Sequence, residues 1–281
     1  KISDIPLSSL ESLSVTDIEE YMEYLKYRDT DGKKISNKEN AVKRKISTLK
    51  SVFKYFYRVE KLSENIMERV QLPKLHSKEI IRLDIDEVAM MIDEAENGEG
   101  LSSRQKAYHN KTKIRDVALL SLLLGTGIRV SECVGLNISD VDFKNNGILI
   151  HRKGGKEVTI YFSDEVKEAL QNYFDERVLI LEESGHEGAL FLSMQNKRLS
   201  VRSVEKLVKK YAKIISPLKK ITPHKLRSTY GTNLYKETGD IYLVADVLGH
   251  SDVNTTKKHY AAIEDDRRRS ARNVVKLREK Q

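Results

Sequence analysis

The sequence is poor in the residues that disulfide-rich, zinc-binding and membrane-spanning proteins need. It has one cysteine, Cys133, and a single thiol can form neither an internal disulfide nor a multi-cysteine zinc site. Its longest apolar run, residues 117–128, is shorter than the roughly 20 residues that a membrane-spanning helix needs. No secretory signal is recognisable. We therefore expect a cytoplasmic protein without a membrane partner, in which Cys133 is a buried free thiol.

The signatures of several enzyme classes are missing too. The seven histidines stand at positions 76, 109, 151, 186, 224, 250 and 259, and no two of them have the H-x₃-H spacing of a helical metal site. There is no G-x-S-x-G elbow of a serine hydrolase and no P-loop of a nucleotide-driven motor. We therefore expect no metal and no other cofactor.

What the sequence has in excess is positive charge. Its formal net charge is +8 over 281 residues, and a hydrophobic share of 39% is enough for an ordinary core. A chain this basic favours a polyanionic partner, with nucleic acid ahead of an anionic membrane. Lysine and arginine are concentrated, with few acidic residues among them, in three blocks over residues 31–61, 194–220 and 267–281.

The first basic block coincides with a helix that we predict over about residues 38–61. Val42, Ile46 and Phe53 mark its buried face, and lysines follow a parallel track to one side. A helix face that carries almost only positive charge predicts contacts with phosphates. A charged face that is merely solvated is the alternative explanation. The DNA-binding residues that we predict are Lys43 and Lys50 in this block, and Lys197 and Arg202 in the second block.

The length of the chain predicts two domains, a helical one over residues 1–72 and a larger one over 83–281, joined by a linker over 73–82. The first domain begins with a predicted helix over 14–25. In the second we expect a helix over 83–95, a polar surface loop over 97–113, a buried helix over 114–124, a hairpin over 147–162, a short strand over 189–193 and helices from residue 200. The predicted fold is mainly α with a small antiparallel sheet, so that the second domain is of the α+β class.

Four polar motifs interrupt the apolar pattern of the second domain. They are GTGIRVSE with Arg129 and Glu132, RKGGK with Lys153 and Lys156, HKLR with His224 and Arg227, and LGHS with His250, which Tyr260 follows ten residues later. Each alone has an ordinary explanation, such as an ion pair, a turn lysine or a satisfied core histidine. Together they supply what phosphoryl transfer on a DNA backbone needs without a metal: guanidiniums for the nonbridging oxygens, a nucleophile, and groups that accept and donate protons.

In this order and spacing the motifs resemble the tyrosine recombinase (phage integrase) family, and the length and layout are similar to its Xer-type members. The resemblance covers nearly the whole chain. It implies a helical core-binding domain that clamps DNA over residues 1–72, and a catalytic domain with a C-terminal helix over 83–281. The sequence departs from many members in its H-K-L-R-S box, where Lys225 and Ser228 stand in place of an aspartate and a histidine.

The resemblance assigns a role to each motif residue that would touch the phosphate. Arg129 and Arg227 are the two arginines that clamp it, and Glu132 is the acidic companion of Arg129. His250 donates a hydrogen bond to the same phosphate.

The resemblance also assigns the proton transfers and the nucleophile. Lys153, rather than Lys156, is the general acid at the tip of the hairpin. His224 accepts a proton, and Tyr260 is the nucleophile, carried to the phosphate by the polar segment that follows His250.

The implied activity is that of a site-specific recombinase, which cleaves and rejoins DNA through a 3′-phosphotyrosine without metal or ATP. The implied partners are double-stranded DNA with paired recombination sites and further copies of the chain, in a homo-tetramer that exchanges C-terminal segments through Val274 and Leu277. An accessory protein or a heteromeric partner stays open. So does the choice between integration or excision of a mobile element and Xer-type dimer resolution. The alternatives are a type IB topoisomerase-like enzyme and a non-catalytic DNA-binding protein.

Overall fold

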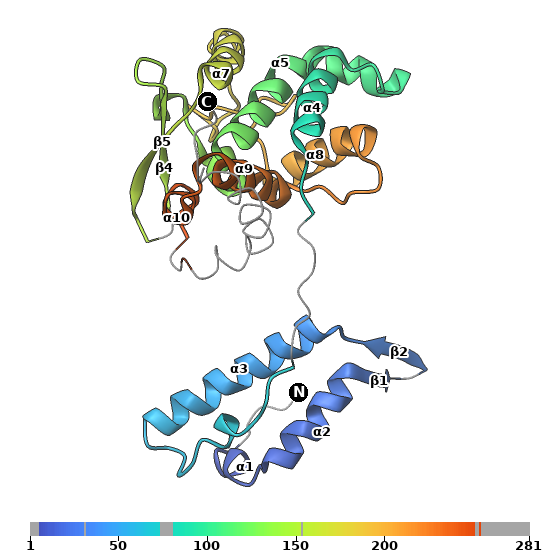
Figure 1. Cartoon of the computed structure of the whole chain (residues 1–281), viewed down its shortest axis with the longest axis vertical. Helices are drawn as coiled ribbons and strands as arrows, with labels where there is room; N and C mark the ends of the chain where they lie inside the picture. The colour runs from blue at the N-terminus through green and yellow to red at the C-terminus, as the bar shows by residue number, and fades with distance from the viewer. Residues whose placement is uncertain (1–5, 31, 74–80, 153, 251–252, 254–281) are drawn as a thin grey trace, which may run out of the picture. The chain divides into compact units, whose positions relative to one another are not determined.

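The computed structural model describes residues 6–30, 32–73, 81–152, 154–250 and 253. The chain divides into two compact units, Lys1–Glu79 and Ile80–Gln281, drawn in Figure 1. Within the described ranges, no helix is both long and apolar enough to cross a membrane. Each unit has a hydrophobic core of its own.

The first unit is built on two long helices. Its elements are α1 (Ser8–Glu11), α2 (Val15–Lys26), β1 (Tyr27–Thr30), β2 (Lys33–Ser36), α3 (Glu39–Arg58) and the 3₁₀ turn η1 (Ile66–Glu68). Helix α2 begins at a capping box, in which the Ser14 side chain accepts from the backbone of Asp17 and the Asp17 carboxylate accepts from the backbone of Ser14. Helix α3 buries Val42, Ile46 and Phe53, which confirms the apolar face that the sequence predicts.

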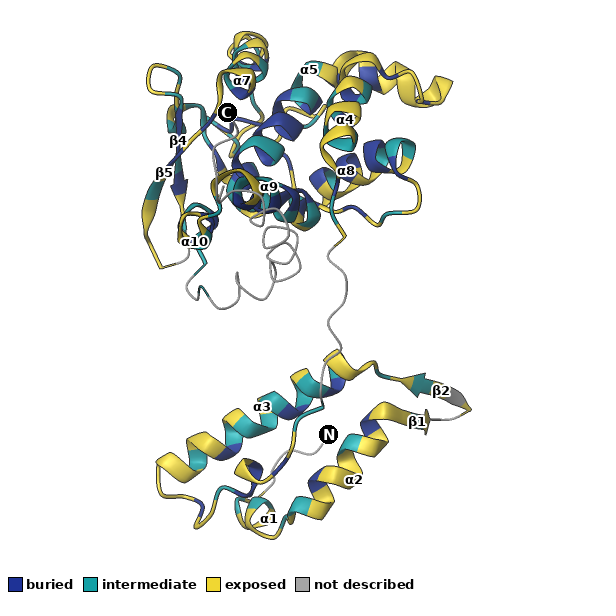
Figure 2. Ribbon diagram, in the orientation of Figure 1, coloured by how far each residue is buried: buried dark blue, intermediate teal, exposed yellow. Residues whose placement is uncertain are grey.

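The second unit holds a three-stranded antiparallel sheet of order β3-β4-β5 among helices. Its elements are α4 (Ile85–Asn97), α5 (Ser103–Thr126), α6 (Val130–Gly135), η2 (Ile138–Asp140), β3 (Val141–Asp142), β4 (Gly147–His151), β5 (Glu157–Tyr161), α7 (Asp164–Arg177), α8 (Val201–Ile215), α9 (Pro223–Thr238) and α10 (Ile241–Leu248). Helix α5 is central and packs against α4, α7 and α9. Its C-terminal half is buried on nearly every side (Figure 2).

These elements confirm the predicted fold class, mainly α with a small antiparallel sheet. The predicted hairpin is present as β4 and β5, with Gly147 opposite Tyr161 and His151 opposite Glu157. Cys133 is fully buried, and burial raises the pKa of its thiol.

Two expectations about local structure are wrong. The polar stretch predicted as a surface loop over residues 97–113 is helical from Ser103, where the Ser102 capping box with Gln105 begins α5. This half of α5 is polar because most of it faces solvent, so no apolar stripe marks it as a helix. The short strand expected over residues 189–193 is a buried irregular segment with only isolated bridges at Ala189 and Leu192.

The β1–β2 hairpin was not expected from the sequence. It pairs Tyr27 with Ser36 and Thr30 with Lys33, between the two long helices of the first unit. Its strands are four residues each and carry mostly charged and polar residues, so they lack the apolar alternation that predicts a strand.

Candidate active site

The C-terminal end of α10 is the point on which the described part of the predicted site converges. Gly249 adopts the left-handed conformation, with φ at 59°, and its N–H donates to Asp246 O at 2.8 Å. The N–H of His250 donates to Ala245 O at 2.9 Å. This pair of bonds is a Schellman motif, in which glycine takes the conformation that other residues avoid. The L-G-H sequence therefore fixes the backbone of His250 directly after the helix.

Three arginines from other elements donate to the last carbonyls of α10 and to the carbonyl of Gly249, which follows it. The first is Arg152, at the end of β4. Its Nη2 donates to Val247 O at 2.8 Å and its Nη1 to Asp246 O at 3.4 Å. The last carbonyls of a helix have no partner within it and carry partial negative charge, so cationic donors stabilise them.

Arg227 and Arg129 complete the set. Arg227, on α9, is buried and donates to Leu248 O through Nη2 and to Gly127 O, at the end of α5, through Nη1 at 2.6 Å. Arg129 donates through Nη2 to Gly249 O at 3.1 Å. Through these guanidiniums, the ends of α5 and α10 are joined to the start of α6 and to the first half of α9. Helices α9 and α10 pack against each other (Figure 1).

Gly127 is required where α5 ends. It has φ at 63°, and a Cβ there would lie 2.3 Å from the ring of Tyr230 on α9. The G-T-G-I-R motif thus ends one helix with a glycine and begins the next, α6, at Arg129, which is the residue that caps it.

Arg129 is held by Glu132. One carboxylate oxygen of Glu132 accepts from the backbone N–H of Arg129 at 2.7 Å, and the other accepts from its Nη1 at 2.8 Å. The Glu132 side chain is only 6% exposed, whereas that of Arg129 is 42% exposed. Arg129 is therefore held by a buried carboxylate, while its side chain stays partly open to solvent, as an anion-binding group requires.

The two histidines lie on the two elements that Arg227 connects: His224 on α9, and His250 just after α10. His224 is exposed in the first turn of α9, three residues before Arg227, a spacing that places both on one side of the helix. His250 is partly exposed and adjoins Gly249, whose carbonyl accepts from Arg129. The structure thus brings Arg129, Arg227 and His250 together and places His224 on the same helix as Arg227.

Lys153 and Tyr260 lie outside the described residues, as do Val274 and Leu277 in the predicted C-terminal exchange segment. Their assigned roles stay predictions.

The predicted DNA-binding residues differ in their surroundings. Lys197, in the loop before α8, and Arg202, in the first turn of α8, are exposed. Lys43 is half-buried on α3. Lys50, also on α3, donates through Nζ to Val70 O at 2.8 Å, so this lysine fastens the segment after η1 to the helix.

Arg152 is a site residue that the sequence alone did not assign. It stands inside the R-K-G-G-K motif, directly before Lys153, and the family resemblance assigns a role only to a lysine of this motif. The one signal in the sequence that could have pointed to Arg152 is that it is a third arginine within the motifs, beside Arg129 and Arg227. Its partners, two backbone carbonyls of α10, leave no mark in the sequence.

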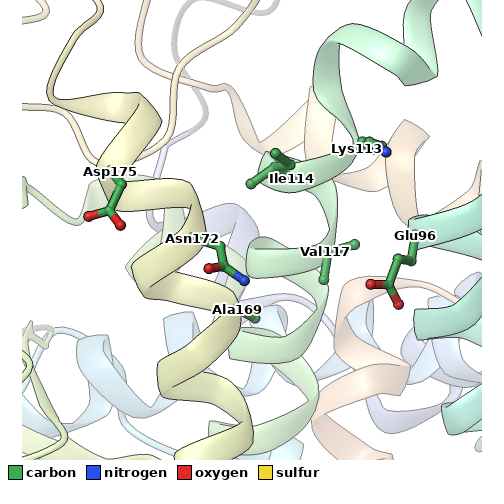
Figure 3. Close-up of a pocket in the computed structure, with 7 residues that line it drawn as sticks. All are labelled: Glu96, Lys113, Ile114, Val117, Ala169, Asn172 and Asp175. Carbon is green, nitrogen blue, oxygen red and sulfur yellow. The ribbon is translucent and has the colours of Figure 1, made fainter.

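Two further observations bear on other kinds of site. Among the described residues, no group of three His, Cys, Asp or Glu side chains could hold a metal ion. A cavity of about 320 Å³ lies between α4, α5 and α7, lined by Glu96, Lys113, Ile114, Val117, Ala169, Asn172 and Asp175 (Figure 3). None of the predicted catalytic residues lines this cavity.

Comparison with known proteins identifies the family. The profile of the phage integrase family matches residues 81–267. The tyrosine recombinase XerS of Streptococcus pneumoniae is 32% identical over 299 residues, which cover 95% of this chain and 81% of XerS. The chain therefore belongs to the phage integrase family of tyrosine recombinases. This confirms the resemblance drawn from the motifs and the expectation of an enzyme of site-specific DNA recombination.

Solved structures agree on the fold. XerH bound to a palindromic difH substrate, in a post-cleavage complex, is 20% identical with a TM-score of 0.71, over 93% of this chain and 72% of XerH. The Tn1549 transposon integrase in complex with circular intermediate DNA is 21% identical with a TM-score of 0.68, over 92% of this chain and 84% of the integrase chain in that structure.

Proposed function

We propose that the protein cleaves and rejoins double-stranded DNA at a specific site through a 3′-phosphotyrosine at Tyr260. The observation that carries the proposal is the convergence of Arg129, Arg227 and His250 on the end of α10, ten residues before that tyrosine. Two guanidiniums beside a histidine suit a phosphodiester, since a planar guanidinium can donate two charge-assisted hydrogen bonds to its nonbridging oxygens.

The phosphate-binding half of the mechanism belongs to these three residues. Arg129 and Arg227 hold the nonbridging oxygens, and His250 donates to one of them. Because the donors are fixed by Glu132 and by the helix-end carbonyls before DNA arrives, they need little rearrangement as negative charge builds up on the oxygens.

The covalent half involves Tyr260, His224 and Lys153. The tyrosine oxygen attacks phosphorus and its proton passes to His224. A bond forms between this oxygen and phosphorus, and the bond from phosphorus to the 5′ oxygen breaks, with a proton from Lys153 completing the leaving hydroxyl. The number of phosphoester bonds is unchanged, so a 5′ hydroxyl from a second strand can reverse the step without ATP.

The partners follow from this chemistry. We propose paired DNA sites and a homo-tetramer with C-terminal exchange through Val274 and Leu277, aided or not by an accessory protein. The XerH and Tn1549 integrase structures are complexes with DNA, which supports DNA as the partner here. The similar proteins include Xer recombinases and a transposon integrase, so we propose that the role is either dimer resolution or mobile-element integration or excision. The cytoplasmic location stays a prediction.

Covalent capture tests the proposal. The protein is mixed with fragmented DNA of its source organism in EDTA and denatured, free DNA is removed, and the DNA that stays attached is sequenced. We expect adducts at one inverted-repeat sequence, and none with Tyr260→Phe, which keeps the fold and loses the nucleophile. Sites on the chromosome away from mobile elements would indicate dimer resolution, and sites at the ends of a mobile element would indicate integration or excision.

The same experiment separates the alternatives. Adducts scattered over unrelated sequences would contradict site specificity and indicate a topoisomerase-like enzyme. DNA binding without any adduct would contradict the covalent mechanism and indicate a DNA-binding protein. An adduct formed by Tyr260→Phe would show that another residue is the nucleophile.

A further inference from the structure

Arg152 stands where the β4–β5 hairpin turns. Its backbone N–H donates to Lys156 O at 2.8 Å, and its own carbonyl accepts from Gly155 N–H at 3.2 Å. These bonds close the turn between β4 and β5. The side chain points away from solvent and is only 13% exposed, which is unusual for an arginine at the tip of a hairpin.

The guanidinium of Arg152 connects this turn to two parts of the site. Its Nη1 and Nη2 donate to Asp246 O and Val247 O in the last turn of α10. Its Nε is buried without a hydrogen-bond partner and lies 4.0 Å from Glu132 Oε1, the oxygen that also accepts from Arg129. One side chain thus contacts the helix that leads to His250 and faces the carboxylate that holds Arg129.

The same guanidinium packs closely against Gly249. A Cβ at Gly249 would lie 2.3 Å from Nη1 and 2.5 Å from Cζ of Arg152. The glycine before His250 therefore serves two purposes: it allows the left-handed turn and it leaves room for Arg152.

The two other arginines that donate to the end of α10 have a second task in the proposed reaction. Arg227 and Arg129 hold Leu248 O and Gly249 O, but both must also bind the phosphate. Arg152, being nearly buried, contacts α10 without that demand. It can hold the end of the helix in place while the phosphate engages its neighbours.

We propose that Arg152 is a positioning residue, which fixes the C-terminal turn of α10 and so sets the place of His250 beside the phosphate. The effect of this positioning on the rate of DNA cleavage rests on the proposed function. The positioning itself is a property of the protein without DNA and can be measured there.

The first test needs no activity. The full chain, labelled with ¹³C and ¹⁵N in histidine, is compared with Arg152→Met by NMR, and the signal of His250 is assigned by its loss in His250→Gln. The matched control is Arg115→Met: Arg115 is 15% exposed and donates to Leu192 O at 2.8 Å, but contacts Asp116 rather than α10. We expect the His250 side-chain signals to move in Arg152→Met and to stay in place in Arg115→Met.

The second test measures the reaction. The substrate is a DNA site identified by covalent capture, and the protein is present at saturating concentration. We expect Arg152→Met to form the adduct about 10²-fold more slowly than wild type, since misplacement of a catalytic group by about 1 Å has an effect of that order. DNA affinity should change little. Arg152→Lys, which retains a cation able to reach one carbonyl, should recover part of the rate, and Arg115→Met should react like wild type.

A 5′-bridging phosphorothiolate substrate shows whether the slow rate of Arg152→Met arises at His250 or at Lys153. Its thiolate leaving group needs no proton, so a defect in proton donation by Lys153 does not slow its cleavage. The slow rate of Arg152→Met should persist on this substrate. Recovery to the wild-type rate would overturn the inference and assign the effect to Lys153. Unmoved His250 signals, or an equal loss in Arg115→Met, would overturn it too. Moved His250 signals with no adduct from wild type would uphold the positioning and contradict the proposed function instead.

Discussion

At the scale of single residues, Arg129 is held in place by other residues of the protein and still has a side chain that an anion can reach. Glu132 holds two of its N–H groups and Gly249 O a third, yet the side chain stays 42% exposed. A purely structural ion pair gains little from such exposure, whereas an anion-binding group requires it.

Arg129→Ala should therefore bind DNA nearly as well as wild type and cleave it about 10²–10³-fold more slowly, because one donor to the transition-state oxygens is removed. Single-turnover adduct formation and a gel-shift titration measure the two effects separately. Glu132→Gln keeps one acceptor for the arginine and should impair cleavage less. Unimpaired cleavage by Arg129→Ala would remove this residue from the catalytic set.

At the scale of elements, the Glu87 carboxylate fastens the start of α4 to the segment between α8 and α9. Partial burial alone would raise the pKa of Glu87, but hydrogen bonds from Lys219, from the Asp84 backbone and from Ser216 lower it overall. The same contact to Glu87 raises the pKa of Lys219. Lys219 and Ser216 lie in the loop between α8 and α9, so this cluster holds the start of α4 against the loop that leads to α9.

The sign of the pH dependence follows from the lowered pKa of Glu87. Its ionised form is favoured in the folded state, so the stabilisation is fully present above the ordinary value of 4.5 and is lost as pH falls through the folded value. Glu87→Gln should reduce the free energy of unfolding by about 1–2 kcal/mol near neutral pH. The difference from wild type should shrink in acid below 4.5. Urea unfolding at several pH values measures this, and a difference independent of pH would contradict it.

The same scale shows which elements the sequence predicts. The apolar stripe of α3 and the paired glycines of the β4–β5 turn are local signals, and both elements are found. The N-terminal half of α5 and the β1–β2 hairpin escaped prediction because they are polar and exposed, and the segment over residues 189–193 because burial alone does not distinguish a strand from an irregular chain.

At the scale of the whole molecule, the predicted site depends on contacts between distant parts of the chain. The motifs around Arg129, Arg227 and His250 are far apart in sequence and meet at the end of α10. Their order and spacing made the set recognisable. The part played by Arg152 was not, because a bond from a side chain to a backbone carbonyl does not depend on the identity of the residue that accepts it.

Charge on the surface of the second unit should govern affinity for DNA. Lys197 and Arg202 are exposed, so Lys197→Gln with Arg202→Gln should weaken binding to all sequences alike and lower the slope of log K against log salt by about one for each phosphate that is no longer neutralised. Binding isotherms at several salt concentrations measure the slope. Lys50→Met is the contrasting variant: because Lys50 holds Val70 O, it should destabilise the first unit. An unchanged slope in the double variant would place the phosphate-binding residues elsewhere.

The most direct measurement of the central claim is the identity of the residue joined to DNA. Trypsin should release that residue in the peptide HYAAIEDDR, residues 259–267, after the captured adduct is digested with nuclease. We expect a nucleotide linked through its 3′ phosphate to Tyr260, together with a free 5′ hydroxyl on the other DNA end that polynucleotide kinase can label. A nucleotide on any other peptide, or a 5′ phosphate left on the released end, would contradict the covalent mechanism.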